Sequence, residues 1–155
     1  MDKVLVTTLL TMAAVVAAVM VVNTMLPALG RSTSAVLSSS TAASDRLKTD
    51  TEIIHVATDT ATFKVYAWIK NTGASEITAI DSGDLFYKTS TTFDRITYNA
   101  SACTDCWSYS IEDDTVWSPG VTIKVTLHLT TLPTGNYLVR FVTRNAVVAE
   151  KEFTV

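Results

Sequence analysis

The chain has 155 residues, a formal net charge of −3, and 48% hydrophobic against 17% charged residues, which fits one ordinary domain plus one apolar segment. A weakly negative total lacks the basic patch that nucleic-acid binding requires, so we exclude nucleic acid as a partner. The charges are unevenly spread: none falls between positions 4 and 30, and the mixed region begins only at Asp45. The chain therefore divides into an apolar beginning and a mildly acidic remainder.

The uncharged run begins at Val4 and includes the stretch TMAAVVAAVMVVNTMLPALG, residues 11–30. About 20 such residues suffice to cross the hydrocarbon of a bilayer as an α-helix, so length and composition predict a membrane span. A secretory signal peptide cleaved after Ala28 is the alternative. Its apolar region is usually about 7 to 15 residues long and follows a positive start, whereas Asp2 and Lys3 cancel here.

The next segment, RSTSAVLSSSTAASDRLK, is rich in Ser, Thr and Ala, a composition also found in flexible linkers. However, Leu29, Val36 and Ala43 are spaced by seven residues, which continues a helical pattern through it. A helix from about residue 2 to about residue 47 would be roughly 65 to 70 Å long, more than twice the hydrocarbon thickness of a bilayer. A single membrane anchor does not need such length.

Beyond residue 50 the apolar residues alternate with a period of two. FKVYAWIKN places Phe63, Val65, Ala67 and Ile69 on one face, and VTIKVTLHLT alternates in the same way. Turn signals such as NTGAS, DSGD, SPG and LPTGN separate the candidates. These signals suggest a β-sandwich. We predict strands at residues 53–58, 63–71, 76–80, 85–88, 96–98, 107–111, 121–130, 137–143 and 147–155.

The two cysteines, Cys103 and Cys106, form a C-x-x-C in the phrase CTDCW. A thioredoxin-like redox centre belongs to a βαβ setting, which this all-β pattern does not provide. A structural zinc site usually needs four ligands, and only His55 and His128 remain as imidazoles. For an exported domain we favour a local disulfide. Free thiols, a metal site and a membrane-tethered redox protein are the alternatives.

Three other groups of residues are candidates for a role. Asn99 in NAS matches the N-glycan acceptor pattern, against its alternative as a turn residue. The acidic run 112–114 could bind calcium but lacks the spacing of a calcium loop, so a solvated turn is favoured. Tyr66 and Trp68 lie opposite the expected core face and are candidates for a subunit contact, or else are partly buried aromatics.

The chain carries none of the usual catalytic motifs, among them G-x-S-x-G, H-E-x-x-H and a phosphate-binding glycine loop. His128 falls on the polar face of its strand, where a surface histidine is the expected role. We therefore predict a protein that is not an enzyme, with no catalytic residue, no metal ligand and no cofactor.

An apolar helix at the N-terminus that leads into a β-sandwich resembles an archaellin or a related archaeal type IV pilin-like protein. The phrases VYAWIKNTGASEI, WSPGVTIKVTL and LPTGNYLVRFVTRN are similar to strand and turn phrases of these families. Leu5 stands where bacterial type IV pilins carry a glutamate, which points to the archaeal side of the superfamily. The resemblance implies an α+β fold: a long hydrophobic helix over residues 1–48, then an all-β immunoglobulin-like sandwich over residues 49–155.

The resemblance also implies a function. The chain would be a structural subunit of an extracellular archaellum or archaeal-type pilus, inserted in the membrane as a precursor and then assembled as a homopolymer for motility or adhesion. A prepilin-type peptidase and a dedicated assembly machinery are the implied partners. The alternative is a membrane-anchored, stator-like accessory protein whose β domain binds the cell envelope. The residues expected in the filament core are Val4, Leu5, Leu9, Met12, Val16, Val19, Met20 and Leu26.

Overall fold

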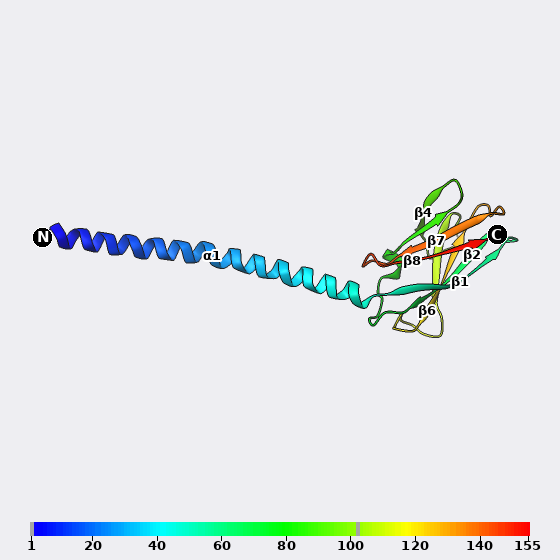
Figure 1. Cartoon of the computed structure of the whole chain (residues 1–155), viewed down its shortest axis with the longest axis horizontal. Helices are drawn as coiled ribbons and strands as arrows, with labels where there is room; N and C mark the ends of the chain where they lie inside the picture. The colour runs from blue at the N-terminus through cyan, green and yellow to red at the C-terminus, as the bar shows by residue number, and fades with distance from the viewer. Residues whose placement is uncertain (1, 102) are drawn as a thin grey trace. The chain divides into compact units, whose positions relative to one another are not determined.

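The computed structural model describes residues 2–101 and 103–155 and contains one long α-helix and eight β-strands (Figure 1). The chain forms two compact units, residues up to 42 and residues 43–155. The helix is α1 (Asp2–Lys48). The strands are β1 (Thr51–Asp59), β2 (Lys64–Asn71), β3 (Asp84–Lys88), β4 (Phe93–Tyr98), β5 (Cys106–Ile111), β6 (Thr122–His128), β7 (Asn136–Val142) and β8 (Val148–Thr154), with a 3₁₀ turn, η1 (Ile80–Ser82), before β3.

The α1 helix continues through the Ser- and Thr-rich segment, so a flexible linker is the wrong interpretation of that composition. The hydroxyl groups of this segment donate to carbonyl groups of the preceding turn, for example Thr33 to Leu29 at 2.9 Å and Thr41 to Leu37 at 2.8 Å. Pro27 lies inside the helix. Because proline has no N–H, the carbonyl group of Asn23 loses its intrahelical donor, but the helix continues on both sides.

The eight strands follow the order β1-β2-β6-β5-β4-β3-β7-β8. Two four-stranded antiparallel halves, β1-β2-β6-β5 and β4-β3-β7-β8, are joined by a short parallel pairing of β4 with β5. The edge strands β1 and β8 approach each other, and the Lys151 ammonium donates to the Ile54 carbonyl group at 2.8 Å. The sheet is therefore nearly barrel-shaped (Figure 1), and the predicted α+β class, a long helix followed by an all-β domain, is confirmed.

The core lies between the two halves of the sheet and contains the inward-facing residues of each strand. Strands β2 and β6 alternate strictly between buried and half-buried positions, as their apolar periodicity predicts. Trp107 and Trp117 are fully buried and meet Phe141 edge to face, with ring centroids 5.7 and 6.1 Å apart. Of the tryptophans, these two fill the core.

Two details of the predicted strands are wrong. Residues 76–80 form only a single bridge, in which Ile77 N–H donates to the Trp117 carbonyl group at 3.1 Å. Ala79 then adopts a left-handed conformation with φ 52°, which turns the chain into η1. Phe63 also has a positive φ of 52° and lies in the turn before β2, 43% exposed, rather than on the core face. Both departures are turns made by non-glycine residues, which periodicity does not detect.

The end of α1 is hydrogen-bonded to the loop that follows β2. The Lys48 carbonyl group accepts from Ala74 and Ser75, and the Asp50 carbonyl group accepts from Thr72 and Gly73. These bonds supply donors that the last turn of a helix lacks. A side chain at Gly73 would collide with the Lys48 carbonyl oxygen and the Asp50 nitrogen, so this position requires glycine.

Asn71 makes the same loop rigid from inside the domain. Its side chain is fully buried, donates to the carbonyl groups of Ser75 at 2.9 Å and Trp117 at 3.0 Å, and accepts from Gly73 N–H at 3.0 Å. A buried amide is tolerated because all of these groups are paired.

Candidate functional site

The largest candidate surface is the apolar face of α1, which covers all sides of the helix. None of its described residues is buried in the chain. Each of the eight residues expected in a filament core exposes at least 53% of its surface. Other large apolar side chains of α1 are exposed as well, and among them Leu29 and Val36 belong to the seam identified from the sequence. These other side chains include Val6, Leu10, Val15, Val21, Val22, Met25, Leu29, Val36 and Leu37.

Such a surface must be buried by something outside the chain, because a helix that is apolar all round is normally surrounded. By length and composition α1 can cross a membrane. Its hydroxyl groups do not oppose burial: Thr7, Thr8, Thr11 and Thr24 donate to carbonyl groups one turn back, as in the later Ser- and Thr-rich segment. The helix thus offers methyl and methylene groups along most of its length.

The outer face of β1 and β2 carries a second candidate surface. Tyr66 and Trp68 are half-buried on β2 with ring centroids 6.3 Å apart, and His55 of β1 lies 5.4 Å from Trp68. The strand pairing of His55 with Trp68 explains this cluster, which sequence spacing did not reveal. Aromatic clusters of this kind are enriched in interface cores. We call these three residues the aromatic cluster.

Cys103 and Cys106 are joined by a disulfide, with Cα atoms 6.0 Å apart. Cys106 is buried at the start of β5, opposite His128 of β6, but His128 instead shares a 3.3 Å hydrogen bond with the Ser108 hydroxyl group. Burial, with Lys64 as a smaller contribution, lowers the pKa of His128. The structure brings no group of three metal-ligating side chains together among the described residues.

Asn99 is exposed and directly follows β4. Its N–H donates to the Trp107 carbonyl group, and its side-chain oxygen accepts from Ser101 N–H, both at 2.9 Å. The residue therefore occupies an exposed turn, where it is accessible both as a glycan acceptor and as a simple turn residue.

The acidic run 112–114 forms a turn of its own. Glu112 pairs with Lys124 at 3.4 Å, and Asp113 has a left-handed φ of 59°, as in a solvated turn.

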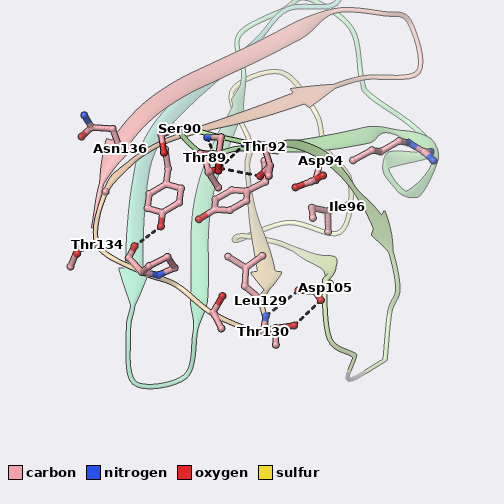
Figure 2. Close-up of a pocket in the computed structure, with 17 residues that line it drawn as sticks. Thr89, Ser90, Thr92, Asp94, Ile96, Asp105, Leu129, Thr130, Thr134 and Asn136 are labelled. Carbon is pink, nitrogen blue, oxygen red and sulfur yellow. Dashed lines mark hydrogen bonds between the residues drawn. The ribbon is translucent and has the colours of Figure 1, made fainter.

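An open groove of about 630 Å³ lies at the ends of β3, β6 and β7. Figure 2 shows Asp105 accepting two hydrogen bonds from Thr130, with Thr89, Ser90 and Thr92 on another part of the lining. The two bonds measure 3.0 and 2.7 Å. Burial raises the pKa of Tyr87, which also lines the groove. Sequence reasoning missed the groove because its residues come from separate segments. Among the described residues, its lining includes no histidine, cysteine or lysine.

Both a family model and a relative match nearly the whole chain. The model of the archaeal-type flagellin family matches residues 3–153. An uncharacterised protein of Archaeoglobus fulgidus is 32% identical over 162 residues, covering 98% of this chain and 98% of that relative.

Solved structures show the same fold at lower identity. The archaellum periplasmic stator protein FlaG from Sulfolobus acidocaldarius is 18% identical with a TM-score of 0.59, over 68% of this chain and 99% of that chain. The archaeal flagellin FlaB1 from Methanocaldococcus jannaschii is 15% identical with a TM-score of 0.57, over 69% of this chain and 90% of that chain. At these identities the likeness establishes the fold and does not distinguish a filament protein from a stator protein. The family match spans nearly the whole chain, helix and sheet together, and the chain therefore belongs to the archaeal-type flagellin family, a family of structural proteins.

Proposed function

We propose that this chain is the structural subunit of an extracellular archaellum or archaeal-type pilus, which polymerises through its N-terminal helix and serves motility or adhesion. The observation that carries the proposal is α1 itself, a helix of 47 residues in which no described residue is buried. At 1.5 Å per residue it is about 70 Å long, whereas the hydrocarbon of a bilayer is about 30 Å thick. The helix is longer than one membrane crossing can cover.

Burial of this surface stabilises the assembled filament against exposure of its helices to water. Full burial of a Val, Leu or Met side chain contributes about 1.5 to 3 kcal/mol, so the eight predicted core residues together contribute roughly 12 to 24 kcal/mol before ordering costs. In the membrane, lipid covers the same residues in the precursor. The proposal is that α1 moves from lipid into a bundle of identical helices, assisted by the peptidase and assembly machinery of this family.

Two features of the β domain complete the proposal. The aromatic cluster would be a contact between neighbouring domains on the outer wall, because two half-buried rings on an exposed sheet face suit an interface core. Asn99 would carry a glycan on the exposed turn after β4. Both belong to the outside of a filament, at the cell surface.

A stator-like accessory role is the second candidate, favoured by the likeness of the β domain to FlaG. An accessory protein needs α1 only as an anchor and its domain as the binding module for the cell envelope. The two functions differ in copy number and in polymerisation. Electron microscopy and mass spectrometry of material sheared from cells separate them, because only a filament subunit is the main protein of a helical fibre.

Val16→Asp tests the filament function within the helix. A buried, unpaired carboxylate is costly, so we expect sheared fibres to disappear. Val116→Asp is the matched control, since it makes the same substitution at an exposed loop position of the β domain and should leave the fibres intact. Normal fibres from Val16→Asp would contradict the proposal.

A further inference from the structure

We propose that Arg31 of one copy pairs with Asp45 of a neighbouring copy, and that this ion pair fixes the axial displacement between adjacent helices in the polymer. The inference rests on the proposed filament function and specifies how far neighbouring helices are displaced along the filament axis. Arg31 is the only charged residue between Lys3 and Asp45. It directly follows the charge-free run, so a polymer that surrounds the run also brings the guanidinium into its helical bundle.

Arg31 has no side-chain partner among the described residues. Of the three ion pairs formed by residues 2–101 and 103–155, none includes a residue of α1, and the Arg31 guanidinium makes no hydrogen bond in this part of the chain. The Asp45 carboxylate is likewise exposed and unpaired there. Burying one charge without the other is costly, whereas a hydrogen-bonded pair offsets much of that cost.

The acidic side chains of α1 are Asp2 and Asp45, so two displacements can pair Arg31. Pairing with Asp45 requires 14 residues, about 21 Å of helix. Residues 4–16 of one copy then lie beside residues 18–30 of the next, and both segments are free of charge. Pairing with Asp2 requires 29 residues and places residues 4–16 beside the Ser- and Thr-rich segment 33–45. The shorter displacement therefore buries more apolar surface.

Arg31 and Asp45 are fourteen residues apart, which places them within about 40° of each other around α1. The seam of Leu29, Val36 and Ala43 lies about 120° to 160° around the helix from Arg31, so each helix presents two separate contact lines.

Charge exchange tests the pair. Arg31→Asp and Asp45→Arg should each lower the yield of sheared filaments about tenfold or more, relative to the membrane pool of subunit, because each leaves like charges together in the bundle. The double variant Arg31→Asp/Asp45→Arg should recover most of the wild-type yield. Lys48→Glu is the matched control, since it reverses another cation of the same helix and should leave the yield unchanged.

A cysteine pair tests the register independently of yield. Arg31→Cys/Asp45→Cys should give a ladder of disulfide-linked multimers from oxidised filaments, whereas the single variants and Arg31→Cys/Asp2→Cys should not. Wild-type yield from both single charge reversals would overturn the inference, and so would crosslinking through position 2 instead of 45; in either case the filament function stands. If fibres sheared from wild-type cells do not contain this chain, the filament function and the ion pair of Arg31 with Asp45 are both overturned.

Discussion

Val36→Asp separates the filament function from the anchor function more sharply than any change within the charge-free run. If α1 only anchors the protein, about 20 residues of the run cross the bilayer, and position 36 lies beyond the hydrocarbon. A carboxylate there is then harmless. In a polymer of α1 helices, Val36 belongs to the seam with Leu29 and Ala43 and is buried against another copy.

The magnitude follows from the exposure of Val36, which is 63% in the isolated chain. Burying that fraction of a valine contributes about 1 to 2 kcal/mol per subunit, and an unpaired buried carboxylate costs several kcal/mol more. A total loss of about 4 kcal/mol lowers the association constant of each subunit contact roughly 10³-fold, since about 1.4 kcal/mol is a factor of ten. Filaments should therefore be absent.

The assay compares wild type, Val36→Asp and Val36→Ala in sheared and membrane fractions by immunoblotting with an antibody to the β domain. Val36→Asp should accumulate in the membrane without fibres, because its membrane-spanning run is unchanged. Val36→Ala controls for the loss of the valine methyl groups and should retain fibres. Fibres of normal number and length from Val36→Asp would refute burial of this part of the helix, and with it the polymer contact along the seam.

Three further predictions concern the β domain and are tested by unfolding of the full chain in detergent. Asn71→Ala should lower the free energy of unfolding by about 1 to 3 kcal/mol, because the Ser75 carbonyl group loses its donor, whereas the Trp117 carbonyl group and Gly73 N–H keep their other backbone partners; a smaller loss would contradict a structural role of this amide. Cys103→Ser should lower the free energy of unfolding by about 2 kcal/mol, because the disulfide no longer closes its short loop in the unfolded chain. Equal unfolding midpoints of the wild-type chain with and without reductant would contradict this prediction. Because the pKa of His128 is lowered in the fold, the unfolded chain binds more protons below about pH 6.5; stability should fall there as pH decreases, and less steeply in His128→Gln.

Much of the fold follows from local patterns. The change from an uncharged run to a period of two separates the helix from the sheet, and strict alternation predicts β2 and β6 residue by residue. The exceptions are at positions where a non-glycine residue turns the chain, as at Ala79 and Phe63. Periodicity registers burial and does not detect such turns, of which the one before β2 is held by the Asp59 carboxylate as it accepts from the N–H groups of Ala61 and Thr62.

The sequence by itself determined the helix, its apolar surface and the all-β class, because these depend on composition and spacing within short segments. It also contained the isolated charge of Arg31, since charge needs no fold to be recognised. Only the tertiary structure decided which residues meet across strands: the aromatic cluster, the buried Trp107 and Trp117 around Phe141, and the Asn71 loop at the end of the helix. Those contacts join residues that are distant in sequence, and strand pairing, which is set by the whole core, brings them together.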